Sequence, residues 1–508
     1  TLTVNKKSLT VTASSPEVEF GAPAPTITPS YSGWVGSDGG SSISGQACST
    51  TYQAGDPVGT YPTSCSGGTA ANYSLTYEAG TLTVEPRTTT TSASINPTSV
   101  QYSDTTRFSA TVSLEGTDPG EVKGTVEFFV GSTSYGTLPV AGGAASRTVS
   151  MVKAVEDGIG GTLPADFTVK AVFTPDSANY AGSNGTTAMR VTPENAFPVG
   201  KTAYVGQRVS WTTTSTSSTA TLTLAGVVQD YSSQVCPDPA YPGCDPWPGN
   251  ITKAKMTFYR VDGTTKTPIK GAEMLSVGWI DPDDRSKGGT AAATIQYELK
   301  SGSICEPFTL GVRVEGAYRM AEPPEHEVEV SVCRATPGTI VGAGGSFSNA
   351  GSQGFLKADS GESQFSFDVK YNKSGTNPQG KVSLRVHTMR RPDGSLDTRM
   401  HTYQITTNAI STLTVNNATG KASFSAKANI TEVIANADDG TVVMVPVDSG
   451  AILQLVLTDG KTGGVDTVGF TVQKASTKGS GGPLWFSSLW DGVKTVEKAI
   501  TAGEISAQ

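Results

Sequence analysis

Hydrophobic and polar residues alternate with a period of two along most of this chain. Such alternation is typical of a strand with one face in a core and the other in solvent. Turn residues separate the alternating runs at short intervals, and no long amphipathic helical pattern interrupts them. The pattern predicts an all-β fold of two-layer sandwiches with almost no helix. Predicted strands include residues 108–112, 126–130, 167–173, 328–332, 365–371, 382–386 and 453–457.

A repeat and three proline-containing joints indicate a modular chain. The segment Thr-Leu-Thr-Val at residues 1–4 recurs at residues 81–84, which is typical of tandem modules and predicts that the chain opens on the closing strand of a preceding repeat. The joints lie at residues 84–87, 191–194 and 334–337. Because proline restricts its own backbone and that of the preceding residue, we expect short semi-rigid spacers and an elongated array.

These breaks divide the chain into an expected set of parts. They are the end of a preceding repeat (1–7), a first β module (8–86), a second (87–194), a third with a cysteine-bearing insertion (195–336) and a C-terminal β-sandwich with a Trp-rich tail (337–508). In that tail, Gly481-Gly-Pro483 reads as a linker before an aromatic strand, and residues 494–500 are predicted to pair with this strand.

Composition narrows the classes of partner. Charged residues make up 16% of the chain, against roughly 25% in ordinary globular domains, so the surface is predicted to be rich in hydroxyls. The net charge is −8 and no Lys/Arg cluster occurs, which excludes nucleic acid and anionic membranes as principal partners. No run of 18 apolar residues is present, so no membrane insertion is predicted. Any export signal or anchor is expected outside this segment.

The cysteines predict disulfides. Cys48 and Cys65 lie among Ser, Gly, Tyr and Pro residues, which favours disulfides in an oxidising compartment over buried free thiols. No two cysteines have the CxxC spacing of a zinc site. In an antiparallel hairpin centred near Arg319, Cys305 falls opposite Cys333. The six residues fall into three local pairs: Cys48 with Cys65, Cys236 with Cys244, and Cys305 with Cys333.

Nothing in the sequence has the pattern of a catalytic centre. His387 lies on the solvent parity of its strand and His401 in a polar segment, so both are predicted to be exposed. His326-Glu lacks the second histidine of a zincin helix. We therefore expect no enzyme, although two carboxylates that converge in space for glycoside hydrolysis leave no local motif.

Two further groups have functional and structural interpretations. Asp281, Asp283 and Asp284 offer oxygen ligands to Ca²⁺, whereas the residues that follow them lack the next ligand and the glycine of an EF-type loop, which favours a solvated turn. We expect no cofactor, with calcium as the alternative. Trp485 and Trp490 offer aromatic faces to a sugar, but residues five apart on a strand face opposite sides, so one is predicted to lie in the core.

Several segments contain motifs of known families. By residues 9–11, 20–25, 56–62, 72–77 and 80–84, the segment 8–85 resembles the MBG repeats of secreted and surface-attached bacterial proteins. By residues 124–128, 136–140 and 167–176, the segment 88–192 resembles bacterial Ig-like repeats. Residues 198–335 are Ig-like by pattern, with 203–206 and 251–258 similar to modules of the same proteins. From residue 338 onward, residues 365–371 and 484–488 resemble a C-terminal β module that closes such arrays.

The resemblance implies location and scaffold without a catalytic residue. We expect a structural or stalk segment of an exported, cell-surface or extracellular bacterial protein, which spaces or displays other domains and can contribute to adhesion. Its expected partners are the neighbouring modules, with a surface glycan, a protein or a second copy as further possibilities. The alternatives are a glycan- or protein-binding module, centred on residues 198–335, and an accessory region of an exported hydrolase. A groove with convergent polar groups would favour binding over spacing.

Overall fold

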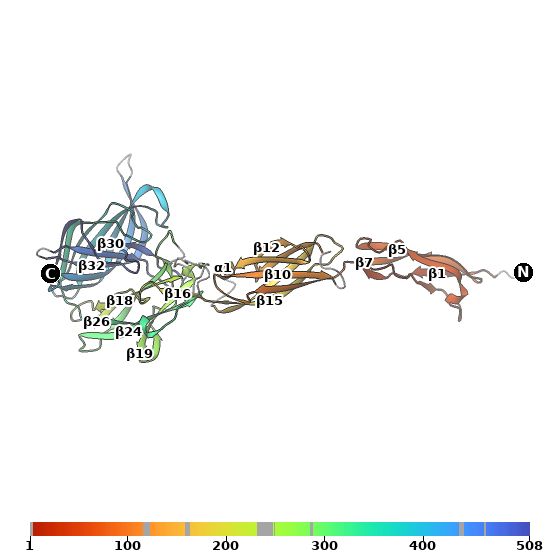
Figure 1. The fold of residues 1–508 in the computed structure, drawn as a ribbon, viewed down its shortest axis with the longest axis horizontal. Helices are drawn as coiled ribbons and strands as arrows, with labels where there is room; N and C mark the ends of the chain where they lie inside the picture. The colour runs from red at the N-terminus through yellow and green to blue at the C-terminus, as the bar shows by residue number, and fades with distance from the viewer. Residues whose placement is uncertain are drawn as a thin grey trace. The chain divides into compact units, whose positions relative to one another are not determined.

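The computed structural model describes residues 4–114, 122–157, 163–230, 247, 249–284, 288–435, 441–461 and 464–508. Strands dominate these residues (Figure 1), which confirms the predicted all-β class. The helical elements in the described part are α1 (Val152–Glu156) and the 3₁₀ turns η1 (Gly40–Ser42), η4 (Ile251–Lys253) and η5 (Pro324–His326). No helix there is long and apolar enough to cross a membrane.

The chain packs as two compact units. The first runs to residue 191 without residues 101–104 and 161–164, which belong with residues 192–508 in the second. Each unit contains two consecutive strand sets, which we call the first to fourth modules: β1–β7, β8–β15, β16–β26 and β27–β36. The predicted boundaries between the modules stay a prediction, because the packing separates the chain only into these two units.

The first module has two sheets of three and four strands, in the orders β3-β1-β6 and β2-β7-β5-β4. Alternation along β1 buries Leu9 and Val11, and β7 buries Leu82 and Val84, so the module holds several small apolar clusters. Its strands are β1 (Lys7–Ala13), β2 (Glu17–Glu19), β3 (Pro29–Ser32), β4 (Ser44–Thr50), β5 (Gly59–Thr69), β6 (Tyr73–Glu78) and β7 (Gly80–Glu85).

The second module is a sandwich of the sheets β13-β10-β8 and β12-β11-β14-β15-β9. Alternate residues of β10 and β11 point inward, and the buried rings of Phe108 and Phe128 meet with centroids 5.8 Å apart. Its strands are β8 (Thr89–Asn96), β9 (Ser99–Gln101), β10 (Thr105–Leu114), β11 (Gly124–Val130), β12 (Thr133–Pro139), β13 (Ala144–Ser150), β14 (Ala165–Pro175) and β15 (Ser183–Thr192).

The third module is also built from two sheets. They have the orders β22-β23-β18-β16-β25 and β17-β26-β24-β19-β20, with β21 paired to β19. The strands are β16 (Glu194–Pro198), β17 (Val209–Trp211), β18 (Thr219–Asp230), β19 (Ala254–Asp262), β20 (Thr265–Pro268), β21 (Leu275–Ser276), β22 (Gly278–Trp279), β23 (Gly288–Glu298), β24 (Cys305–Gly316), β25 (Tyr318–Arg319) and β26 (Val328–Cys333).

The fourth module differs from the predicted sandwich, because its ten strands form one continuous sheet. At one edge β36 pairs with β27, and β35 pairs with β33 near the other edge, so one sheet encloses one large core. Its strands are β27 (Thr339–Ser348), β28 (Glu362–Tyr371), β29 (Pro378–Arg390), β30 (Leu396–Asn416), β31 (Lys421–Ala435), β32 (Val442–Thr458), β33 (Thr467–Gln473), β34 (Leu484–Ser487), β35 (Lys498–Ala499) and β36 (Ala502–Ala507).

The third and fourth modules lie side by side in the second unit (Figure 1). Ser476 exchanges hydrogen bonds with Ala292 of β23: its N–H donates to the Ala292 carbonyl (2.8 Å), and its hydroxyl accepts from the Ala292 N–H (3.2 Å). Ile452 of β32 packs against Ala225 and Ala292. The third module therefore covers the outer face of the fourth module's sheet near β32.

Two segments predicted as linkers are built into this interface. A Cβ on Gly481 would stand 2.4 Å from the Val277 carbonyl oxygen, so only glycine permits this approach. The joint at residues 334–337 is also packed: Ala335 is buried, and its N–H donates to the Thr212 hydroxyl at 3.0 Å. Neither segment acts as a free spacer.

Candidate ligand-binding site

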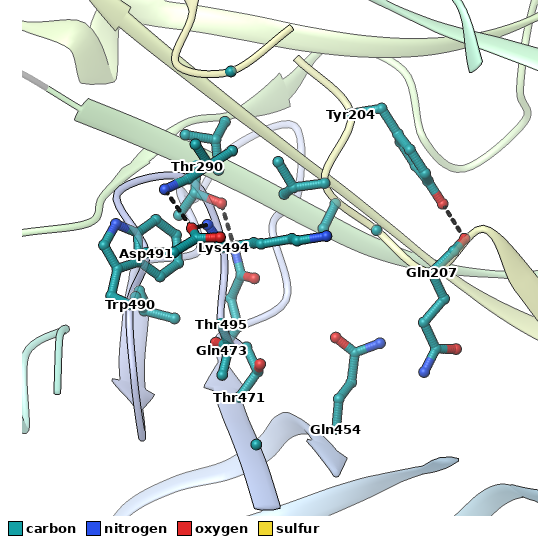
Figure 2. A pocket seen from close by; sticks show the side chains of 18 of the residues that line it. Tyr204, Gln207, Thr290, Gln454, Thr471, Gln473, Trp490, Asp491, Lys494 and Thr495 are labelled. Atoms are coloured by element: carbon teal, nitrogen blue, oxygen red, sulfur yellow. Dashed lines mark hydrogen bonds between the residues drawn. The ribbon is translucent and has the colours of Figure 1, made fainter. Parts of the chain in front are cut away.

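A cavity of about 570 Å³ opens between the third and fourth modules of the second unit (Figure 2). Its floor is the outer face of β32 and β33. Leu453 and Leu455 point into the core, so strand alternation turns Gln454 outward, where Thr471 of β33 is its direct cross-strand partner. The strand pattern thus places an amide beside a hydroxyl on the cavity floor.

One wall of the cavity is formed by residues 200–208, in the segment that follows β16. Buried Tyr204 donates a hydrogen bond from its hydroxyl to the Gln207 carbonyl at 2.8 Å, and burial raises the pKa of this tyrosine, which keeps the ring neutral. A Cβ on Gly206 would stand 2.6 Å from the same hydroxyl, so glycine lets the segment turn tightly over the ring. This segment is further fixed by the Val205 N–H, which donates to the Ala225 carbonyl at 2.9 Å.

Another wall of the cavity is formed by the segment after β34, which includes Trp490 and Asp491. Asp491 Oδ1 accepts the N–H groups of Val493 and Lys494 at 2.9 and 2.8 Å, which shapes a turn. Trp490 packs beside Leu484 and faces the cavity (Figure 2). Trp485 lies in the core, as predicted for one of the two tryptophans, whereas Trp490 follows the end of β34 and is not on the same strand.

Polar groups converge on the cavity from different strands. Gln473 donates its amide to the Thr290 hydroxyl at 2.9 Å and to the Gly482 carbonyl at 3.3 Å, which fixes that side chain. The Gln454 Nε2 is buried and has no hydrogen-bond partner among the described residues. Amide and hydroxyl groups beside an indole are suited to a small ligand that carries many hydroxyls.

The predicted calcium candidates have a different role in the structure. Lys357 Nζ lies 3.0 Å from Asp281 and 2.9 Å from Asp283, while Arg390 holds Asp283 through two nitrogens at 2.9 and 2.7 Å. The Arg390 hydrogen bond, assisted by Lys357, lowers the pKa of Asp283 to about 2. Asp284 follows them, half-buried. Two of the three carboxylates thus pair with cations of the fourth module.

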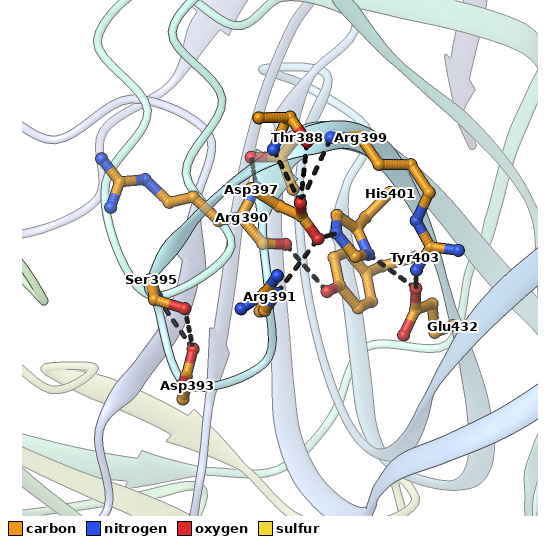
Figure 3. A network of polar contacts seen from close by, with 11 residues as sticks. Thr388, Arg390, Arg391, Asp393, Ser395, Asp397, Arg399, His401, Tyr403 and Glu432 are labelled. Carbon is orange, nitrogen blue, oxygen red and sulfur yellow. Dashed lines mark hydrogen bonds and ion pairs between the residues drawn. The ribbon is translucent and has the colours of Figure 1, made fainter.

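The prediction for His401 is wrong. Its ring is 3% exposed, with Nδ1 2.6 Å from Glu432 and Nε2 3.0 Å from Asp397 (Figure 3). The His401 hydrogen bond, followed by that of Arg391, holds the pKa of Asp397 below its ordinary value. Glu432 comes from β31, so sequence proximity gave no signal of this contact. His387 has the predicted parity but is half-buried beside Thr402.

Disulfides join two of the cysteine pairs. Cys48 of β4 is bonded to Cys65 of β5, and Cys305 is bonded to Cys333. The latter pair lies directly opposite across β24 and β26, in the register that the sequence predicts. Cys236 and Cys244 lie outside the described residues. No cluster of three or more His, Cys, Asp or Glu suited to a metal occurs in the described ranges.

Sequence reasoning missed the cavity residues Gln454, Thr471 and Gln473. A weak signal exists, because Gln454 interrupts an otherwise apolar run, Leu453-Gln-Leu-Val-Leu457. Polar residues on the outer face of a strand are ordinary, however, and their convergence depends on the third module that covers them.

The strand sets and the cavity define a modular β protein with a cavity between two modules of its second unit. Residues 9–83 match the MBG domain family (YGX type), which confirms the resemblance of the first module. No curated protein matches the chain.

The chain is similar to several solved structures. The adhesin InvE of Yersinia pseudotuberculosis is 13% identical over 48% of this chain and 59% of its own, with a TM-score of 0.26. The chain thus spans about three fifths of that structure. The Escherichia coli adhesin FdeC is 14% identical over 65% and 98%, with a TM-score of 0.19. Three N-terminal domains of the bacteriophage RB49 outer capsid protein Hoc are 13% identical over 64% and 99%, with a TM-score of 0.22. None of these similarities assigns a function to this chain.

Proposed function

We propose that this chain is a segment of an exported bacterial surface protein in which the second unit binds a saccharide and the first unit spaces it from other domains. The MBG match of residues 9–83 and the disulfides support an extracytoplasmic location. The cavity between the third and fourth modules supports the binding role over spacing alone.

The observation that carries this proposal is the convergence of Gln454, Thr471 and Gln473 on the cavity floor. The Gln454 side chain offers an amide, and Thr471 beside it offers both a donor and an acceptor. Sugar hydroxyls supply both partners, and Trp490 offers an apolar surface to the less polar face of a sugar ring.

The size of the cavity fits a small saccharide. Small-molecule sites span roughly 300–1,000 Å³, and this cavity is about 570 Å³. Its walls come from both modules, which agrees with the preference of ligand sites for interfaces between structural parts.

Binding fits the site better than hydrolysis. Glycoside hydrolases use two carboxyl groups on either side of the scissile bond, whereas Asp491 is the one carboxylate among the described residues that line the cavity. One of its oxygens already accepts two backbone N–H groups. We therefore infer a binding module and no enzymatic activity in this unit.

A filling variant tests the proposal. Thr471→Leu places a branched apolar side chain on the cavity floor. The control variant Thr431→Leu makes the same change at a half-buried residue of β31 that does not line the cavity. We expect the wild type and Thr431→Leu to bind the same members of a glycan array, and Thr471→Leu to lose that binding. Saccharide binding that survives Thr471→Leu places the site elsewhere, and the lack of any glycan binding by wild type leaves spacing as the function.

A further inference from the structure

The charge of the cavity is opposite to that of the chain. The whole sequence has 37 Lys and Arg against 45 Asp and Glu, for a net charge of −8. The charged residues that line the cavity are Lys201, Arg208, Lys494 and Asp491. Three cations against one carboxylate make this a locally positive site on an acidic protein.

These cations are available to a ligand. In the part of the chain that the structure describes, neither Lys201, Arg208 nor Lys494 forms an ion pair, and all three side chains are exposed. Asp491 and Glu497 are the acids nearest in sequence to Lys494, and they accept backbone N–H groups and threonine hydroxyls instead. An anionic ligand would therefore break no existing ion pair.

The cations also come from two walls of the cavity. Lys494 extends across the cavity toward the side where Tyr204 and Gln207 lie (Figure 2). Arg208 follows Gln207 in sequence and also lines the cavity. At the rim the two segments meet, because a Cβ on Gly200, beside Lys201, would lie 3.1 Å from a Val493 methyl group, beside Lys494. The segment after β16 and the segment after β34 thus each contribute cations to the lining of the cavity.

We propose that the saccharide bound here is an acidic sugar, an inference that rests on the proposed function of the cavity. Its carboxylate pairs with Lys494 and Arg208, and its ring hydroxyls bond to Gln454 and Thr471. A guanidinium matches the two oxygens of a carboxylate, and an ammonium adds a point charge. A cavity with low-dielectric walls and one sign of charge also concentrates ligands of the opposite sign.

Matched sugars separate this inference from the function on which it rests. Isothermal titration of the full chain would compare glucuronate with glucose, and N-acetylneuraminate with its methyl ester, each at 50 and 500 mM salt. We expect at least one acid to bind about tenfold more tightly than its neutral counterpart at low salt, and this advantage to shrink at high salt. Lys494→Gln and Arg208→Gln should each weaken binding of the acid several-fold more than binding of the neutral sugar.

Lys373→Gln provides the matched control, because it removes the same charge from an exposed lysine after β28, outside the cavity. Equal binding of acid and neutral sugar overturns the acidic specificity but keeps the saccharide site. Failure of all four sugars in the presence of glycan-array binding also overturns it. Competition by acetate as strong as by the acidic sugar shows a simple carboxylate site and overturns both proposals.

Discussion

The two units join their modules in different ways. In the first unit, the joint is made by a few local contacts. The Phe20 and Tyr180 rings meet edge-on with centroids 5.6 Å apart, the Arg87 N–H donates to the Asn179 carbonyl at 3.0 Å, and the Val58 N–H donates to the Asn179 side chain at 3.0 Å. In the second unit, parts of two sheet faces meet through apolar clusters, ion pairs and close glycine contacts. End-to-end contacts are sufficient for spacing, whereas a cavity with several walls needs faces from two modules.

The largest expected effect comes from the single core of the fourth module. Phe470→Ala removes a fully buried ring that lies 5.7 Å from both Phe347 and Phe365, centroid to centroid, and should lower stability by about 3–5 kcal/mol. Because the third module packs on this sheet, calorimetry should show the loss in the transition of the second unit. The counterpart Phe108→Ala should move the other transition. If both variants shift the same transition, the units are not independent.

The next largest loss of stability is expected in the first module, because its small apolar clusters depend more on a disulfide than the large core of the fourth module does. The Cys48–Cys65 bond spans 17 residues, and the loss of its effect on unfolded-chain entropy should lower stability by about 3 kcal/mol. The double Ser variant should therefore lower only the first unit's transition. Protein reduced with dithiothreitol, which also opens Cys305–Cys333, is expected to show both transitions lowered.

A smaller effect should follow from crowding the interface between the third and fourth modules. Gly481→Val places a side chain against the Val277 carbonyl, and overpacking of this kind lowers stability by about 1–3 kcal/mol. Gly479→Val is the control, because a Cβ there meets nothing within 4 Å. Hydrogen exchange should rise at β22 and β23 in the first variant only. Equal exchange in both variants would argue against a tight interface.

The smallest effect should be the pH dependence of the Asp283 ion pairs. Because its pKa is lowered to about 2 from 3.8, ionised Asp283 stabilises the fold at pH above about 4, and this contribution disappears as the pH falls toward 2. Its side chain is 51% exposed, so screening by water limits the contribution to about 1 kcal/mol. Asp283→Asn should lower stability at pH 7 by that amount and flatten acid unfolding between pH 4 and 2.

The control for that experiment is Asp368→Asn, an exposed aspartate of β28 with no ion pair in the described ranges. Urea unfolding at pH 7, 4 and 2 measures both variants. A steeper acid dependence in Asp283→Asn than in wild type would contradict the assigned sign.

Local patterns in the sequence predicted much of the fold. Strand alternation gave the all-β class, and the register of a hairpin near Arg319 placed Cys305 opposite Cys333. The match of residues 9–83 confirmed the predicted resemblance of this segment to MBG repeats. These features depend on neighbours in sequence or on a repeated scaffold, which a single sequence records.

Contacts between distant segments were beyond the sequence. The contact of His401 with Glu432 links two strands whose pairing could not be predicted from the sequence. The polar residues around His401 therefore led to the prediction that its side chain is exposed to solvent. The glycines near residue 481 have the composition of a linker, although the same lack of a side chain permits close packing. The cavity shares this origin, because Gln454 becomes a site residue only when the third module covers its strand.

The parallel pairing of early and late strands has a consequence for tension along the chain. In the first module β2 pairs in parallel with the closing strand β7, and in the third module β17 pairs in parallel with β26. A pull on the two ends of such a module drags the paired strands past each other in opposite directions. The hydrogen bonds of the ladder are then strained together in shear, instead of opening one by one. Resistance to pulling is set by the unfolding rate rather than by equilibrium stability, so a module with a small core can still hold under load.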